Sequence, residues 1–252
     1  MNHPSTDRGH ACDWLVFGAH PDDAELGMGG TILKAVQAGR SVVVVDWTRG
    51  ELGTRGDGDL RVREASEAAA FMGLKERVQL DLGDGYFEGD RKVLELLVRT
   101  IRRYRPSVVW GNTLSDRHPD HGRAAGILRR AVFMAGLPKV LASEANSSPE
   151  FAHLTAWRPQ LLGFYIQDHY RVPHLVVDIT AQGKAKMELL ACYSSQFYQE
   201  ASTEPETPIS RPDFLPFVEA RSREMGRLIG VELGEGFVLD RPLSQRDMAL
   251  LV

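Results

Sequence analysis

Short, uninterrupted apolar runs alternate along the chain with longer segments in which apolar residues recur at helical spacing. The first run, residues 14–17, has the sequence WLVF, and the second, residues 41–47, contains four consecutive valines. Continuous apolar runs of this length are typical of parallel strands that are covered on both faces. Further strands are expected at residues 78–82, 107–110, 161–166 and 175–179.

Segments with helical periodicity lie between these runs. Gly39 and Gly73 follow two of them at the position of a C-terminal cap, and Pro106 marks the break before a strand. The expected helices cover residues 25–38, 60–72, 92–104, 122–135 and 183–197. Regular alternation of strands and helices predicts an α/β fold: a single Rossmann-like domain with a doubly wound, mainly parallel sheet and helices on both faces.

The length of 252 residues, with 43% hydrophobic and 25% charged residues, suits one α/β domain. We expect a flexible N-terminal tail at residues 1–12 and one folded domain at residues 13–252. Residues 137–159, rich in Ser, Ala and Pro, are expected to be irregular and are a candidate lid or oligomer contact. Residues 201–212 contain several prolines and are expected to form a surface loop.

Net charge and cysteine content indicate which ligands the protein is expected to bind and in which compartment. A net charge of -4 and a pI near 6.1 give no overall attraction to nucleic acid or anionic membranes, so a small-molecule substrate is expected. Cys12 and Cys192 cannot build a disulfide framework or a thiolate zinc site, which fits a reducing cytoplasm. No apolar run reaches the ~18 residues of a membrane span, so no membrane partner and a cytoplasmic location are expected.

The chemistry is concentrated in a phrase, His-Pro-Asp-Xaa, that occurs twice. Residues 20–23 follow the first predicted strand and residues 118–121 follow the fourth. In a doubly wound sheet these two strands lie side by side, and ligands bind at their carboxyl ends. We therefore expect the two phrases to meet in one crevice; the alternative is two unrelated turns with surface histidines.

Spacing within each phrase favours a metal site. His20 and Asp23 are three residues apart, as are His118 and His121, so each pair can present its side chains to one side. A hydrolytic zinc site needs three N or O ligands and one open position. Two histidines and one aspartate from these phrases suit Zn²⁺ and would also accept Fe²⁺ or another divalent ion.

One aspartate and one histidine then remain for catalysis. Asp22 is placed to take a proton from the attacking water, although it could instead be the N-cap of the following helix. His118 is placed to act as an acid or to stabilise an oxyanion. Asp116 and Asp120 flank His118, and Asp120 is expected to hold its second ring nitrogen.

These residues resemble a known family. Residues 19–23, the loop at 48–56 and residues 116–121 are similar to motifs of the LmbE-like or PIG-L deacetylase superfamily, and within it to the deacetylases of bacillithiol biosynthesis. The similarity extends through residues 193–197, 219–221 and 235–237. It implies a zinc-dependent N-deacetylase that removes acetate from an N-acetylglucosaminyl conjugate, here N-acetylglucosaminyl malate, and a homo-oligomer, often a hexamer.

The resemblance also implies roles for individual residues. It implies His20, Asp23 and His121 as metal ligands, Asp22 as the general base and His118 as the electrophilic or acidic partner. It implies substrate contacts from Glu51, Arg55 and Arg61. For the two arginines, the alternative is a solvated loop charge or a helix-surface ion pair worth under ~1 kcal/mol.

Two positions depart from the family pattern. Asp116 stands where the relative that deacetylates an inositol-linked glucosamine has a tyrosine, which argues against the inositol-linked substrate. Ala24 separates Asp23 from Glu25, whereas the family motif often has HPDDE.

Other functions remain as alternatives: a deacetylase of another N-acyl amino sugar or thiol conjugate, a non-catalytic sugar- or metal-binding protein, and a nucleotide-binding Rossmann-like protein. The glycines at residues 27–30 come too late after the first strand for a pyrophosphate-binding fingerprint. Fold alone cannot exclude the non-catalytic alternative, but the presence of both Asp22 and His118 argues against it.

Overall fold

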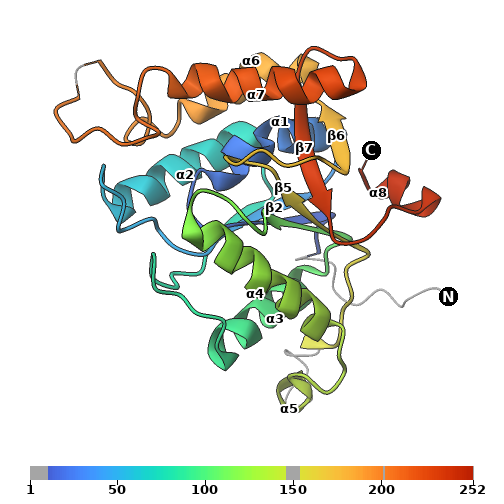
Figure 1. Cartoon of the computed structure of the whole chain (residues 1–252). Coiled ribbons are helices and arrows are strands. Elements are labelled where there is room, and N and C mark those ends of the chain that lie inside the picture. The colour runs from blue at the N-terminus through green and yellow to red at the C-terminus, as the bar shows by residue number, and fades with distance from the viewer. Residues whose placement is uncertain (1–10, 146–153, 201, 252) are drawn as a thin grey trace.

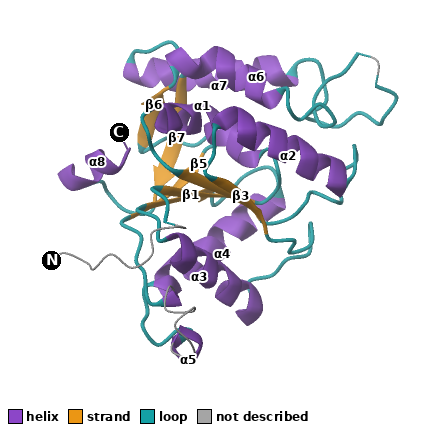
Figure 2. Ribbon diagram, turned by 180° about the vertical axis from the view of Figure 1, so that it is seen from behind, coloured by secondary structure: helices purple, strands orange, loops and turns teal. Residues whose placement is uncertain are grey.

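A computed structural model describes residues 11–145, 154–200 and 202–251, and shows one seven-stranded sheet with helices on both faces (Figures 1 and 2). The strand order is β3-β2-β1-β4-β5-β7-β6. The parallel strands are β1 (Trp14–Gly18), β2 (Val42–Asp46), β3 (Glu76–Gln79), β4 (Val108–Asn112) and β5 (Leu161–Tyr165). β7 (Gly234–Leu239) runs antiparallel to both β5 and β6 (Leu175–Asp178). The predicted Rossmann-like, mainly parallel α/β fold is confirmed.

Helices form a layer on each side of the sheet. In Figures 1 and 2 the layer above the sheet contains α1 (Asp23–Gln37), α2 (Gly58–Met72), α6 (Gly183–Leu190) and α7 (Phe214–Ile229). The layer below contains α3 (Arg91–Tyr104) and α4 (Pro119–Ala135). Two short helices, α5 (Ala142–Ala145) and α8 (Met248–Leu251), lie outside these layers, and 3₁₀ turns cover Thr180–Gln182 and Gln245–Asp247.

The two helical layers explain why the central strands are apolar up to their carboxyl-terminal residues. Val16 and Val44 belong to the core under α1 and α2, whereas Phe17 and Val45 belong to the core over α3 and α4. Successive side chains of a strand point to opposite faces, so a strand covered on both faces needs apolar residues throughout.

The first and fourth strands are neighbours, as expected: Trp14 of β1 pairs with Val108 of β4.

Some elements differ from expectation. The helix expected at 183–197 ends at Leu190, and the chain continues as turns. Helix α7 and strand β7 were not predicted. Of the region expected to be irregular, residues 142–145 form α5, while residues 146–153 lie outside the described part of the chain, as do residues 1–10 of the expected tail. Cys12 is already buried, and its N–H donates to the carbonyl of Tyr104.

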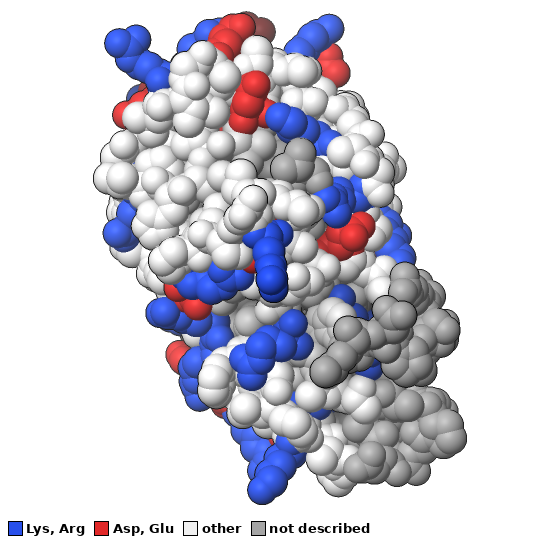
Figure 3. Space-filling view, turned by 90° about the vertical axis from the view of Figure 1, so that its right-hand side faces the viewer, with Lys and Arg blue, Asp and Glu red and all other residues white. Residues whose placement is uncertain are grey.

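The surface does not carry its charge evenly. On the face shown in Figure 3, acidic side chains are interspersed with basic ones in the upper half, whereas Lys and Arg predominate below. Within the described residues, no helix is both long and apolar enough to span a lipid bilayer.

Helix α1 is broken at Met28, whose φ and ψ are not helical. The N–H groups of Gly30 and Thr31, which begin the second half of the helix, donate to the carboxylate of Glu235 in β7 at 3.0 and 2.7 Å. Lys186 of α6 donates to the same carboxylate at 2.7 Å. A carboxylate at a helix N-terminus is favourable, and the buried ion pair completes its coordination. This contact fixes α1, and with it residues 22 and 23, against the carboxyl-terminal strand.

Candidate metal centre

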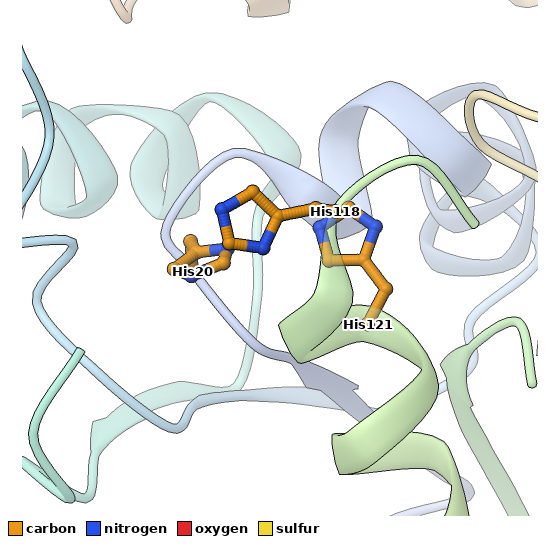
Figure 4. Close-up of side chains that lie close together, drawn as sticks. All are labelled: His20, His118 and His121. Carbon is orange, nitrogen blue, oxygen red and sulfur yellow. The ribbon is translucent and has the colours of Figure 1, made fainter. Parts of the chain in front are cut away.

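The two His-Pro-Asp phrases meet at the carboxyl ends of β1 and β4. The ring centres of His20 and His118 are 4.5 Å apart, and those of His118 and His121 are 5.2 Å apart (Figure 4). One ring nitrogen from each of the three histidines lies within 4.8 Å of the others. The expectation that topology brings both phrases into one crevice is confirmed.

His20 and His121 are held in the same way. Nε2 of His20 lies 3.0 Å from Asp84 Oδ1, and its Nδ1 faces Asp23 Oδ2 at 3.5 Å. Nδ1 of His121 lies 2.8 Å from Asp116 Oδ2, and its Nε2 faces Asp23 Oδ1 at 3.1 Å. Each imidazole therefore has one nitrogen held by a carboxylate and the other directed at Asp23. This is the arrangement by which proteins orient histidines that bind metals.

Asp23 is fixed from three further directions. Its Oδ2 accepts hydrogen bonds from the backbone N–H of His20 at 2.9 Å and from Asn112 Nδ2 at 3.0 Å. Its Oδ1 accepts one from Gln167 Nε2 at 2.8 Å. Burial opposes ionisation, but the neighbouring His121 and His20 hold the pKa of Asp23 well below its usual value. The carboxylate is thus ionised and ordered, as a metal ligand must be.

The donor set fits a divalent cation. Burial alone would lower the pKa values of His20 and His121, yet nearby carboxylates raise the pKa of His20 well above its usual value and that of His121 to about 9. The surrounding carboxylates are Asp22, Asp23, Asp84, Asp116 and Asp120. So dense a group of buried acids favours a positive charge among them. Two imidazoles and a carboxylate are zinc ligands, and they also suit ferrous iron.

A second grouping of possible ligands shares His20: it combines that residue with Asp84 and Asp120. Both carboxylates approach Nε2 of His20, at 3.0 and 3.4 Å, on the side away from Asp23. They are therefore better suited to orient the ring than to share an ion with His121.

Asp22 occupies the N-cap position of α1, but its side chain makes no capping hydrogen bond. Its φ of 104° lies in the left-handed region, which costs a non-glycine residue about 1–3 kcal/mol. Oδ2 accepts a hydrogen bond from Arg61 Nη2 at 3.0 Å. Burial raises the pKa of Asp22 to about 7, although Arg61 opposes the shift. The conformation directs a basic carboxylate into the site instead of onto the helix end.

The Asp120 carboxylate was expected to hold a ring nitrogen of His118, but the structure does not show this contact. Nδ1 of His118 accepts from the backbone N–H of Asp120 at 3.3 Å, while the Asp120 carboxylate binds Gly85 N–H, Arg123 and His20. Burial, followed by the charges of His20 and His121, lowers the pKa of His118. Among the described residues the carboxylate that orients a histidine of the second phrase is Asp116, and it orients His121.

The three residues expected to contact substrate lie in different surroundings. Arg61 is buried and lines the cavity in front of the histidines. Arg55 is also buried, but it binds Glu204, Ser202 and the carbonyl of Phe197, and so ties two loops together. Glu51 accepts from the N–H groups of Arg49 and Asp84. Neither Glu51 nor Arg55 lines the cavity, so their substrate contacts stay predictions.

Three positioning residues were missed by the sequence reasoning: Asp84, Asn112 and Gln167. Asn112 ends β4, Gln167 lies just after β5, and Asp84 lies in the loop after β3. All three therefore project from the carboxyl edge of the sheet. Polar residues that directly follow apolar runs are a signal that could have identified the first two.

The cavity, of about 400 Å³, is bounded on one side by the histidines, Asp22 and Asp23 and on the other by α7. A pocket at the carboxyl ends of adjacent parallel strands, with buried imidazoles and carboxylates at its base, defines a metal-dependent hydrolase of α/β architecture.

Comparisons with known proteins agree. The model of the PIG-L family, described as GlcNAc-PI de-N-acetylase, matches residues 15–132. Diacetylchitobiose deacetylase of Thermococcus kodakarensis is 33% identical over 199 residues, which cover 74% of this chain and 70% of the relative. The chain belongs to the PIG-L (LmbE-like) deacetylase family and is a metal-dependent N-deacetylase.

Two solved structures extend the similarity over nearly the whole fold. The conserved protein TT1542 from Thermus thermophilus is 33% identical, with a TM-score of 0.79 over 92% of this chain and 96% of its own. N,N'-diacetylchitobiose deacetylase from Pyrococcus horikoshii is 26% identical, with a TM-score of 0.78 over 92% and 84%.

Proposed function

We propose that this protein hydrolyses the acetamide of an N-acetylglucosaminyl conjugate, using one divalent ion, Zn²⁺ by preference, held by His20, Asp23 and His121. The observation that carries the proposal is the matched pair of imidazoles. Each has one nitrogen held by a carboxylate and the other turned to Asp23. A site for structural zinc would be closed by a fourth protein ligand, whereas this one opens onto a cavity.

When bound, the ion would polarise the acetamide carbonyl and make water a nucleophile at neutral pH. Asp22 is suited to accept the proton of the attacking water on its carboxylate, because burial has made it a stronger base than an exposed aspartate. The same proton can then pass to the departing amine. The carbon–nitrogen bond breaks, and acetate and the free amino sugar leave. Arg61 holds the carboxylate in place at 3.0 Å.

The contacts of His118 support a neutral role. Because Nδ1 accepts the N–H of Asp120, the proton of the neutral ring lies on Nε2. A lowered pKa favours this uncharged form. From there Nε2–H can donate to the carbonyl oxygen as negative charge develops on it. We therefore assign His118 to oxyanion stabilisation, one of its two expected roles.

The identity of the group attached to the amino sugar does not affect the proposed reaction. The family resemblance implies malate, as in bacillithiol biosynthesis, while two relatives are named for diacetylchitobiose. Both are N-acetylglucosaminyl conjugates, so both agree with the proposed reaction. A homo-oligomer, which the family resemblance implies, is also part of the proposal.

The direct test is to incubate the zinc-loaded protein with methyl N-acetylglucosaminide, diacetylchitobiose and N-acetylglucosaminyl malate, and to measure acetate and primary amine together. We expect equal amounts of both products from at least one of the three. N-acetylalanine serves as a control amide and should stay intact. If no sugar amide is hydrolysed by fully loaded protein, the proposed function is wrong.

A further inference from the structure

The cavity has two unlike halves. The half at the ends of β1 and β4 is polar and carries the proposed metal ligands. The opposite half, formed mainly by α7 and the loop before it, is apolar and is lined by Ile166, Ile209, Phe214, Phe217, Val218 and Met225. Phe217 is 46% exposed, so part of its side chain is accessible to a ligand. A substrate whose acetamide reaches Asp22 would extend its other end toward this wall.

The cations that line the cavity are already engaged. Among the described lining residues these are Arg61, Arg117, Lys186 and Arg221. Arg61 binds Asp22 at 3.0 Å, Arg117 binds Asp168, and Lys186 binds Glu235 at 2.7 Å. An anionic substituent would have to compete with an existing carboxylate for each of these three. Breaking the buried pairs of Arg61 and Lys186 is costly, whereas the pair of Arg117, whose side chain is 44% exposed, is weaker.

Of these four described cations, Arg221 is the one without a carboxylate contact. Its guanidinium donates to the carbonyl of Gln167 and lies over the ring of Phe217, 4.8 Å from the ring centre. A guanidinium that lies over an aromatic ring makes a cation–π contact with it, and the aliphatic part of the arginine side chain adds apolar surface to the wall of the cavity. Arg221 therefore belongs to the apolar half by its packing, although it carries a charge.

We propose that the group attached to the amino sugar is uncharged and presents an apolar face, which packs against Phe217 and its neighbours on α7. This inference rests on the proposed function and names its substrate class. It differs from the malate conjugate that the family resemblance implies. Malate would bring two carboxylates into a cavity where three of the four described lining cations already pair with a carboxylate and the fourth, Arg221, lies over the ring of Phe217.

The test compares kcat/KM for three acetamides that differ only in the attached group: the benzyl and methyl glycosides of N-acetylglucosamine and the malate conjugate. We expect the benzyl glycoside to exceed both others by about tenfold, since burying one aromatic ring against an apolar wall contributes on that order. A malate conjugate hydrolysed faster than the benzyl glycoside would overturn the inference. Loss of that malate preference in Arg221→Gln would then identify Arg221 as an anion-binding residue.

A variant pair locates the effect. Phe217→Ala should raise KM for the benzyl glycoside about tenfold, with little change in kcat, and leave the methyl glycoside within about twofold of wild type. Phe71→Ala is the matched control, because Phe71 is 43% exposed on α2 and does not line the cavity. An unchanged benzyl preference in Phe217→Ala would contradict the inference. Failure to hydrolyse any of the three compounds would instead count against the proposed function.

Discussion

Replacing Asp22 by asparagine will lower kcat by about 10²- to 10⁴-fold while the protein keeps its metal, because the variant loses a positioned base. Asparagine tolerates the left-handed conformation of residue 22 and preserves the shape of the side chain. It cannot take a proton from water. Steady-state kinetics and metal analysis on the same preparation separate the two effects.

Asp81→Asn is the matched control for Asp22→Asn. Asp81 is also an aspartate with a positive φ, at 57°, but it lies on the surface and pairs with Arg49. Its replacement should leave kcat unchanged. Wild-type turnover by a fully metal-loaded Asp22→Asn protein would show that Asp22 has only a structural role, in the left-handed backbone conformation at the start of α1.

The second large effect is expected in His121→Ala, which should lose more than about 10²-fold in zinc affinity, because removal of a partner that merely orients a ligand already costs roughly 10- to 100-fold. Removal of the ligand itself should exceed this. Competition with a coloured chelator measures the affinity directly. His169→Ala is a suitable control, because that exposed histidine lies outside the ligand cluster. If His121→Ala retains stoichiometric zinc, the ligand assignment is wrong.

Local sequence patterns were sufficient to predict the centre of the sheet. The valines of β2 alternate between two cores, and a short continuous run of apolar residues is typical of a parallel strand covered on both faces. The crevice followed from topology, since strands one and four are adjacent in the usual order of a doubly wound sheet, where the winding reverses. These two steps placed His20 beside His118 without any knowledge of distances.

Helix α7 was not predicted, because it follows the proline-containing segment 201–212 closely and itself contains a proline, Pro216. In the structure Pro216 lies in the first turn of α7, where a helix has no hydrogen bond to lose. Strand β7 was missed because Gly234 and Gly236 weaken a strand signal. A Cβ atom on Gly234 would lie 2.8 Å from the backbone nitrogen of Gly226 in α7, so close packing of helix on strand requires glycine there.

The orienting partners of the histidines depended on tertiary contacts. Asp84 reaches His20 from a loop 64 residues away, and nothing in its local sequence distinguishes it from other loop aspartates. Asp116 and Asp120 both flank His118, and spacing alone could not decide between them. The backbone N–H of Asp120 occupies Nδ1 of His118, which leaves the Asp120 carboxylate free to bind Gly85 N–H and Arg123.

The most direct test of a single catalytic ion per chain is a zinc titration of chelator-stripped protein, with acetate release from an N-acetylglucosaminyl conjugate as the readout. The stripped protein should be inactive. Activity should then rise in proportion to added zinc and level off at one ion per chain, and Asp22→Asn should bind the same amount of zinc without recovering activity. Full turnover by the stripped protein would contradict the account.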